Sequence, residues 1–401
     1  MSVMFKQLTP RTIEPKVAAY HLNDCFGPND TELSVGFVPY RIRPLGAHLD
    51  HQGGKVLSQC TSFGVKGYWR RNGLNRVRVS SHGFGQADID LNADLVSEAD
   101  GFDYLRGTLA QFRANEYPLI GIDLLVDGAL TACGLSSSAA ITLLYQELLC
   151  QSMRVSLEAE QRIDWAVACE NHFIGVQSGV GDQTPMLFAG DGESVLYDCR
   201  LREAKRIVPK DPWRFLVINS GQSAALSEAS SFNDRVAESI EAAREIASLL
   251  KRPLEGARLG DFSDAEWSDL TSRLSATAQR RSAHFFTEMT RVHAGEKALL
   301  AGDPVRFGAL MNASCQSSID QYETGTNLLI ELVRHLQAID GVYGARFSGA
   351  GTRGCVVALI EDDADRHILN DLAGRVSPDI REYADQQWAF TTSAHAGLKV
   401  S

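Results

Sequence analysis

The sequence predicts a mixed α+β protein built from two domains. The chain has 401 residues, of which 44% are hydrophobic, whereas a single core seldom grows beyond about 250–300 residues. Short strand-like stretches alternate with longer segments whose apolar residues recur at helical spacing. A turn from Pro209 to Pro212 lies near the middle, and the part after it is richer in helix. We therefore expect one domain over residues 1–205 and a second over residues 206–401.

The first half predicts three strands and two helices. The strands are expected at Val35–Val38, Val77–Val79 and Gly121–Val126. One helix should run from Ser136 to about Gln151, because apolar residues recur there at helical spacing: Ile141, Leu144, Tyr145, Leu148 and Leu149. The next should begin near Ser156, carry two glutamates in its first turn and end before Gly175.

The second half predicts three strands and two helices. Trp213–Ile218 is typical of a buried strand, and two apolar stripes at helical spacing follow: Val236, Ile240, Ala243, Ala247 and Leu250, then Leu328, Leu332, Val333 and Leu336. Two strands, Tyr343–Phe347 and Val356–Ile360, flank a turn rich in glycine. We interpret the acidic run Glu361–Asp363 as a solvated turn with a helix N-cap, not as a metal site.

Composition argues against several classes of function. A net charge of -11 does not suit a nucleic-acid partner, because contact with a phosphate backbone requires a basic surface. No stretch approaches the ~18 apolar residues of a membrane span, and Met1–Glu14 lacks the apolar core of a signal peptide. The eight cysteines are scattered without metal-ligand spacing, which favours reduced thiols. We expect a cytoplasmic protein without membrane or nucleic-acid partners.

The segment Gly134–Ala140 places a glycine and three serines where a loop turns into a helix. Unpaired backbone N–H groups and the helix dipole attract anions at such a terminus, and small side chains let phosphate oxygens approach. The same pattern also arises where a serine merely caps the helix.

Two further segments gather chemically active side chains. Pro39–Gly54 concentrates arginine, histidine and aspartate, which suits a polyhydroxylated ligand but also fits a solvated loop. In Glu170–Gln183, one carboxylate could bind Mg²⁺ while the other accepts a proton from an attacking hydroxyl. Asp182 also fits the role of a simple turn-former. A glycine-rich turn, Ser348–Cys355, is weak evidence by itself.

Taken together and in this order, the four segments resemble the GHMP small-molecule kinases, specifically the galactokinase branch. The stretches Phe307–Met311 and Tyr322–Glu323 also resemble that family, so the likeness covers nearly the whole chain. It implies a two-domain GHMP kinase fold with the active site in the cleft between the domains. The first domain would hold the sugar signature, the phosphate loop and the catalytic aspartate. The second domain would hold the glycine-rich turn Ser348–Cys355. The implied ligands are ATP, Mg²⁺ and a sugar or sugar acid.

The resemblance also assigns roles to single residues. Asp182 matches the catalytic base and Arg41 the arginine that stabilises the transferring charge. Ser138 and Glu170 match the Mg²⁺ ligands. The phosphate-binding positions are Gly134, Leu135, Ser136, Ser137 and Ser138. The sugar-contacting positions are His48, Asp50 and Gly181.

Some positions depart from the galactokinase pattern. A glutamate that accepts a hydrogen bond from the sugar's C6 hydroxyl is replaced by Ala47. Arg43 stands in place of an asparagine, Arg353 in place of a glycine, and Phe232 in place of a tyrosine near the sugar. Before the serines, Leu130 and Ala132 replace a proline and a glycine. We count Ala47, Arg43 and Phe232 among the substrate-binding residues.

A glutamate at position 47 would oppose a carboxylate at C6 by roughly 1 to 4 kcal/mol at ~4 Å, and alanine removes that penalty. The chain therefore resembles most the galacturonokinases, which phosphorylate galacturonic acid at C1. Three alternatives stay open: a galactokinase acting on galactose, a catalytically silent regulator that binds sugar and ATP on the same fold, and a kinase for mevalonate or an amino acid. The last fits the sugar-type signature His48–Gly54 poorly.

Overall fold

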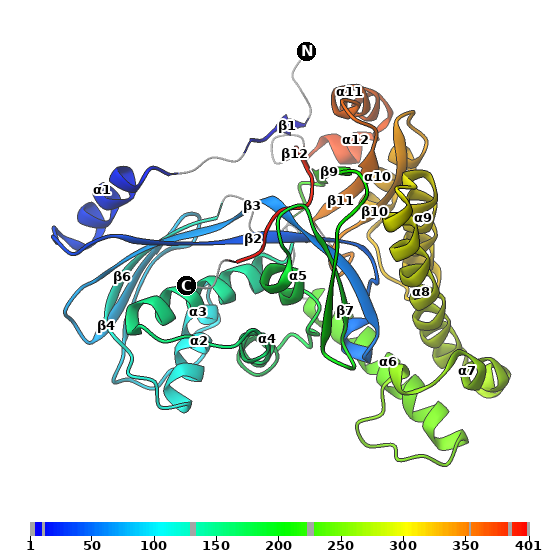
Figure 1. Ribbon diagram of the computed structural model, residues 1–401, viewed down its shortest axis with the longest axis horizontal. Coiled ribbons are helices and arrows are strands. Elements are labelled where there is room, and N and C mark those ends of the chain that lie inside the picture. Colours follow the sequence, from blue (N-terminus) through cyan, green and yellow to red (C-terminus); the bar gives the residue numbers. More distant parts are fainter. Residues whose placement is uncertain are drawn as a thin grey trace.

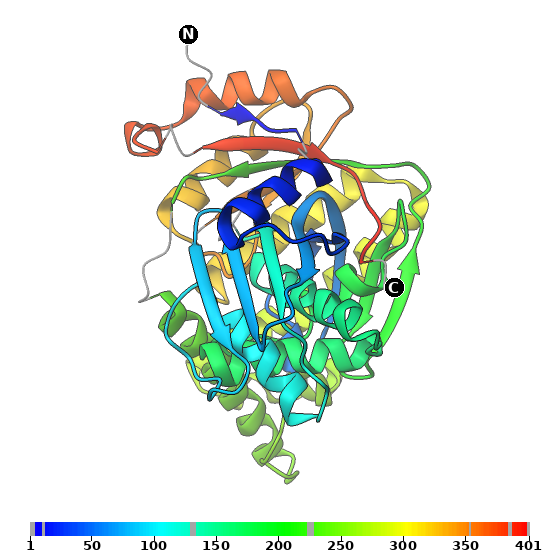
Figure 2. The ribbon, with the colours of Figure 1, turned by 90° about the vertical axis from the view of Figure 1, so that its left-hand side faces the viewer.

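Two β-sheets form the framework of the protein. The computed structural model describes residues 5–9, 13–128, 134–222, 228–352, 354–383 and 387–398. The strands of one sheet run roughly crosswise to those of the other (Figures 1 and 2). Leu130, Ala132 and Arg353, singled out above, lie outside the described residues.

The first sheet is centred on two long antiparallel strands, β2 (Ser34–Leu45) and β3 (Lys55–Arg71), which run along the length of the molecule (Figure 1). Within the described residues the strand order is β5-β4-β6-β3-β7-β8, with β2 paired to β3. The other strands are β4 (Arg76–Ser81), β5 (Gly85–Asp90), β6 (Ile122–Asp127), β7 (Ser194–Asp198) and β8 (Glu203–Ile207).

One buried helix, α3 (Ser137–Met153), packs directly on β2 and β3. Gly36 and Gly67 make this contact close, since a Cβ on either would lie 2.7 or 2.5 Å from the side chain of Leu148. The surrounding helices are α1 (Pro15–Phe26), α2 (Asp103–Ala114), α4 (Ala159–Ala168) and α5 (Gln183–Phe188). A wider π-helical turn, Cys169–Ile174, continues α4.

The second sheet has the order β1-β12-β9-β11-β10 within the described residues. Its strands are β1 (Lys6–Gln7), β9 (Arg214–Asn219), β10 (Val342–Phe347), β11 (Cys355–Ile360) and β12 (Trp388–Thr392). Its helices are α6 (Glu228–Leu249), α7 (Asp264–Leu270), α8 (Ala276–Ala301), α9 (Pro304–Asp320), α10 (Asn327–Gln337), α11 (Asp365–Arg375) and α12 (Pro378–Arg381). Short 3-10 turns occur at Asp50–Gln52, Leu259–Asp261 and Thr271–Arg273.

The strands and helices expected from the sequence are confirmed. Most ends are shifted by a few residues, but the strand expected at Val35–Val38 continues to Leu45. The long antiparallel helices α8 and α9 were not foreseen, nor were α1, α2 and α5. The run Glu361–Asp363 is a turn before α11, but the expected side-chain cap is wrong, because Ala364 occupies the N-cap position and cannot supply one. The chain passes from the first sheet to the second between Ile207 and Arg214. A domain division at residue 205 stays a prediction.

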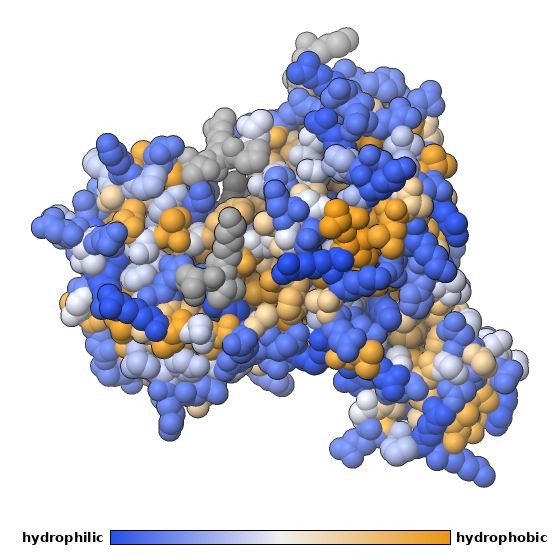
Figure 3. Space-filling view, in the orientation of Figure 1, coloured by the Kyte–Doolittle hydropathy of each residue, from blue (hydrophilic) through white to orange (hydrophobic). Residues whose placement is uncertain are grey.

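Both ends of the described chain cross between the sheets. β1 pairs in parallel with β12, far from the rest of the N-terminal half. Beyond β12, the backbone N–H groups of His395, Gly397 and Leu398 donate hydrogen bonds to the first half of the chain. On the face shown in Figure 3, hydrophilic residues dominate and hydrophobic ones form small separate groups. None of the described helices is both long and apolar enough to span a bilayer.

Candidate active site

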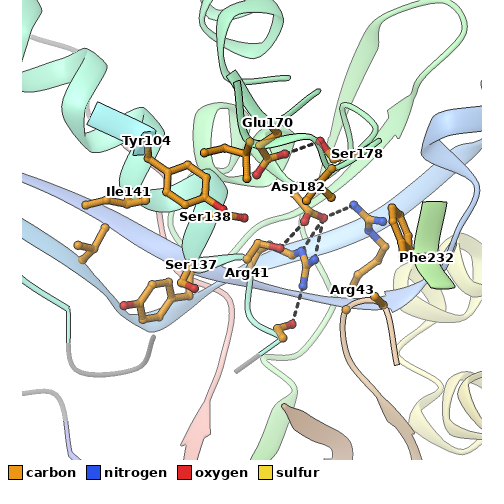
Figure 4. A pocket seen from close by; sticks show the side chains of 18 of the residues that line it. Arg41, Arg43, Tyr104, Ser137, Ser138, Ile141, Glu170, Ser178, Asp182 and Phe232 are labelled. Carbon is orange, nitrogen blue, oxygen red and sulfur yellow. Dashed lines mark hydrogen bonds and ion pairs between the residues drawn. The ribbon is translucent and has the colours of Figure 1, made fainter. Parts of the chain in front are cut away.

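A cavity of about 590 Å³ opens between elements of the two sheets. Its lining combines β2, the start of α3, the π-helical turn, the loop before α5 and the glycine turn between β10 and β11. Tyr104 and Ile141 lie at one end and Phe232 at the other, with Glu170 and Asp182 between them (Figure 4). The segments that carry the sequence motifs therefore share one cleft.

Asp182 is held by two guanidinium groups and a hydroxyl (Figure 4). Its Oδ1 accepts hydrogen bonds from Arg41 at 2.7 and 3.0 Å and from Arg43 at 2.6 Å. Its Oδ2 accepts from the Ser136 hydroxyl at 2.5 Å. Burial by itself would raise the pKa of Asp182, but the two arginines outweigh it and lower the pKa to about 2. The carboxylate is therefore ionised at neutral pH.

Arg43 links Asp182 to a second carboxylate. Arg41 and Arg43 stand two residues apart on β2, so both side chains project from the same face of the strand. Arg43 Nη1 lies 3.5 Å from Asp50 Oδ2, which also accepts a hydrogen bond from the Gly181 N–H at 3.2 Å. Asp50 and Asp182 thus share one cation, which lets two carboxylates occupy the same pocket.

The N-terminus of α3 opens into the cavity. Ser136, Ser137 and Ser138 line it together with Gly134. Ser136 adopts a left-handed backbone with φ 59° and makes no capping hydrogen bond, because its hydroxyl is committed to Asp182. The interpretation of this serine as a plain N-cap is therefore wrong. The first turn of a 17-residue helix therefore borders a ligand-sized space, and the free backbone N–H groups of such a turn suit an anion.

The glycine-rich turn between β10 and β11 contacts the start of α3. The Gly134 carbonyl accepts hydrogen bonds from Arg41 at 3.1 Å and from the Ser348 hydroxyl at 2.8 Å. The Leu135 carbonyl accepts one from the Arg41 N–H at 3.2 Å. Leu135 and Gly181 are the predicted site residues that do not line the cavity, and both contribute through backbone atoms.

Glu170 reaches the cavity from the π-helical turn (Figure 4). It is buried, the Ser178 hydroxyl donates a hydrogen bond to it, and Ser138 contacts it as well. Burial raises the pKa of Glu170 to about 7. Within the described ranges, no cation forms an ion pair with this carboxylate. A buried carboxylate beside a hydroxyl and a phosphate-binding terminus has the oxygen chemistry that Mg²⁺ prefers, so the residues present fit this metal.

We call the end of the cavity at Phe232 the polar end. There, His48 lies in a left-handed turn with φ 60° and stacks on Tyr322, with ring centroids 4.0 Å apart. Its Nε2 is buried without a hydrogen-bond partner among the described residues, and His48 is one of the residues that line the cavity. Burial lowers the pKa of His48 well below its usual value, so the ring is neutral. Phe232 from α6 closes this end of the cavity and packs edge-on against His51.

Sequence reasoning missed the residues that support this end. Glu288 Oε1 accepts hydrogen bonds from the N–H groups of Gly46 and Ala47 at 2.7 and 3.3 Å. His284 Nε2 lies 3.0 Å from the Ala47 carbonyl oxygen. His284 and Glu288 stand one helical turn apart on the buried side of α8. Two polar residues one turn apart on the apolar side of a helix were the sequence signal by which His284 and Glu288 could have been found.

Tyr104 and Ile141 lie at the opposite end of the cavity (Figure 4). The lining as a whole also includes the side chains of Phe84, Val126, Tyr145 and Val176. Apolar side chains beside a helix N-terminus suit a nucleotide base. The cavity thus offers, in order, space for a base, for phosphates and for a polar second ligand.

Two family models and a solved structure match the chain. The family model described as GHMP kinases N terminal domain matches residues 103–190, and the one described as GHMP kinases C terminal matches residues 296–375. A galactokinase from Lactococcus lactis, solved in complex with galactose, superimposes with a TM-score of 0.85 at 27% identity, covering 96% of this chain and 99% of its own.

Two curated relatives have similar identity to the chain. A galacturonokinase from Arabidopsis thaliana is 30% identical over 84% of this chain and 85% of its own length. A galactokinase from Lactococcus lactis subsp. cremoris is 32% identical over 82% of this chain and 83% of its own. The chain therefore belongs to the GHMP kinase family and is an ATP-dependent sugar kinase of the galactokinase type.

Proposed function

We propose that this kinase transfers the terminal phosphoryl group of ATP to the anomeric hydroxyl of D-galacturonate, giving galacturonate 1-phosphate and ADP. The observation that carries the proposal is Ala47. Ala47 lines the cavity and is 4% exposed, at the position where galactokinases carry a glutamate that accepts a hydrogen bond from the C6 hydroxyl. Without that carboxylate, an acidic C6 group meets no like charge from position 47.

Asp182 would orient the anomeric hydroxyl and accept its proton as the new O–P bond forms. A carboxylate with a pKa of about 2 is a weak base, so we infer that proton transfer comes late, as a loose phosphoryl-transfer transition state permits. Arg41 would neutralise charge on the transferring group. The N-terminus of α3 would hold the phosphates through its backbone N–H groups.

Ser138 and Glu170 would hold Mg²⁺. When bound, the metal supplies positive charge to the phosphate oxygens. Glu170 suits this role because its buried charge lacks a protein cation within the described residues, so a divalent ion would relieve its burial cost. His48, Asp50, Gly181 and Phe232 would contact the sugar, with the neutral His48 ring offering its unpartnered Nε2 to a hydroxyl.

A panel of sugars tests the proposal. ATP-dependent phosphorylation of galacturonate, galactose, glucuronate and arabinose is measured side by side, and kcat/KM should be highest for galacturonate. Ala47→Glu should lower kcat/KM for galacturonate by about 10- to 100-fold, because a carboxylate returns beside C6, and should spare galactose. Asp182→Asn is the matched control and should lower kcat for every sugar by about 10²- to 10⁴-fold.

The outcomes separate the candidate functions. A higher kcat/KM for galactose would overturn the proposal and indicate a galactokinase. Binding of sugar and ATP without turnover of any sugar would indicate a catalytically silent regulator.

A further inference from the structure

The charges at the polar end of the cavity fall into two groups. Arg41 and Arg43 face Asp182 and Asp50, so two cations meet two anions. This first group is balanced within the protein, and the proposed function already assigns Arg41 to the transferring phosphoryl group. A carboxylate on the substrate must find its counter-ion elsewhere, because burying an unpaired charge is strongly unfavourable.

The second group consists of Arg346, Arg291 and Glu288, and so has two cations and one anion. Arg346, from β10, is 2% exposed and lines the cavity. Its guanidinium donates hydrogen bonds to neutral oxygens: the Phe347 carbonyl at 3.1 Å, the Ser314 hydroxyl at 2.5 Å and the Ser318 hydroxyl at 3.5 Å. The carboxylate paired with it, that of Glu288, is 3.9 Å away.

Glu288 is already engaged by another arginine. Its Oε2 accepts a hydrogen bond from Arg291 at 2.6 Å, and Arg291 does not line the cavity. Glu288 thus forms ion pairs with two arginines and lies closer to Arg291, the one that does not line the cavity. The positive charge of Arg346, on the cavity wall, is left only partly compensated.

Arg346 also lies near position 47. Glu288 Oε1, 3.9 Å from Arg346 Nη1, accepts the Ala47 N–H at 3.3 Å, and the Ser314 hydroxyl bridges Glu288 and Arg346. A carboxylate placed beside the Ala47 methyl group would therefore enter the field of this arginine. In galactokinases, the glutamate at position 47 would itself place a negative charge beside this arginine.

We propose that Arg346 is the counter-ion for the carboxylate of the sugar and sets the preference for an acidic substrate. The inference rests on the proposed function, since it assigns the residue that recognises the C6 carboxylate of galacturonate. The substrate would bring the negative charge that this chain lacks at position 47. A buried guanidinium suits that task, because it can donate two parallel hydrogen bonds to a carboxylate.

The experiment compares galacturonate with its neutral 6-amide, which has nearly the same shape. KM and kcat for both are measured in the wild type, in Arg346→Gln and in Arg346→Lys. The wild type should favour the acid by about 100-fold in kcat/KM. Arg346→Gln should abolish most of this preference, leaving about twofold or less, mainly through KM for the acid, whereas Arg346→Lys should leave a preference of about tenfold.

Arg162→Gln is the matched control. Arg162 is a fully buried arginine paired with Glu147 at 2.9 Å, and it does not line the cavity. Its loss should lower the midpoint of thermal unfolding but leave the ratio of acid to amide unchanged. If Arg346→Gln does not fold, Arg346→Lys decides: KM for the acid should rise about tenfold, because an ammonium cannot make the paired contact, with KM for the amide unchanged.

An unchanged ratio of acid to amide in Arg346→Gln, or equal changes for both substrates in Arg346→Lys, would overturn the assignment of Arg346 while leaving galacturonate as the substrate. A wild type that prefers galactose over galacturonate would instead overturn the proposed function itself. The two failures are therefore distinguishable.

Discussion

His284 shows how a single side chain supports the polar end of the cavity. Its Nδ1 lies 2.8 Å from the Ser317 hydroxyl and its Nε2 lies 3.0 Å from the Ala47 carbonyl oxygen. Burial lowers the pKa of His284 to about 4, from the usual 6.5. The ring is therefore neutral in the folded protein at a pH where it would be protonated in the unfolded chain.

This difference makes stability depend on pH. A pKa depressed by folding contributes stability that is present above pH 6.5 and is lost as the pH falls toward 4, because only the unfolded chain then takes up the proton. The loss amounts to about 3 kcal/mol over that window. His284→Gln should flatten the fall of unfolding free energy between pH 7 and pH 4.5 by up to about 1.4 kcal/mol per pH unit.

Urea unfolding at pH 7 and pH 4.5 measures this effect. The same substitution at the exposed His21 provides the control for replacing a histidine by glutamine outside the core. An identical slope in wild type and His284→Gln would contradict this expectation.

At the same scale, the sequence reveals some site residues and conceals others. Arg41, Asp182 and the serines of Gly134–Ala140 lie in compact motifs, so their chemistry could be predicted from neighbours along the chain. Glu288 and Arg346 could not, because their meaning depends on contacts made across the fold, 242 residues apart for Gly46 and Glu288. A buried polar residue on a helix shows that a partner exists, but not which one.

At the scale of elements, the start of α3 and the turn between β10 and β11 are packed backbone to backbone. Gly134 has φ 76°, and a Cβ there would lie 2.7 Å from the Ser348 carbonyl oxygen. Glycine is thus required at position 134 for two reasons: its backbone conformation and the close approach of the turn between β10 and β11. The N-terminus of α3, proposed above to bind phosphate, is positioned by this contact.

Gly134→Ala should therefore separate the two motifs. We expect kcat to fall by about 100-fold, because small displacements of positioning groups are costly in catalysis. Steady-state kinetics and thermal unfolding are measured together. Gly73→Ala is the control, since Gly73 has φ 69° but a Cβ there would meet nothing within 4 Å. It should lose about 1 kcal/mol of stability and no activity. Equal kinetics in both variants would contradict the positioning role.

Elements with strong local patterns were predictable and those defined by distant packing were not. The stripe of Val236–Leu250 repeats at helical spacing and lies in α6, apart from Leu250, which directly follows the helix. α8 is 26 residues long, yet polar groups such as Arg281, His284 and Glu288 occupy its buried side. They interrupt the apolar periodicity on which prediction relies.

At the scale of the whole molecule, both ends of the described chain hold the two halves together. β1 adds to the second sheet beside β12, and the segment after β12 returns to the first half. Leu398 is buried there, and its N–H donates a hydrogen bond to the Met186 carbonyl at 2.6 Å. These crossings couple the sheets that flank the cavity, and no local sequence pattern indicates them.

Leu398→Ala should lower the free energy of unfolding by about 2–4 kcal/mol, as expected for a buried leucine. Denaturant unfolding followed by two spectroscopic probes measures the loss. Leu300→Ala, at a half-exposed position on α8, is the control and should change stability by less than about 0.5 kcal/mol. A loss at Leu398 as small as at Leu300 would show that this crossing contributes little.

The wide turn Cys169–Ile174 adds residues to the helical repeat between α4 and the loop that carries Asp182. Each added residue rotates everything after it by about 100° around the helix axis. Glu170, near the start of this turn, therefore faces the cleft through the number of helical residues that precede it as much as through its chemistry. Evolution or engineering can exchange many side chains in α4, but inserting or deleting one residue there would turn this carboxylate away from the cleft, whereas the loop before Asp182 can absorb such a change.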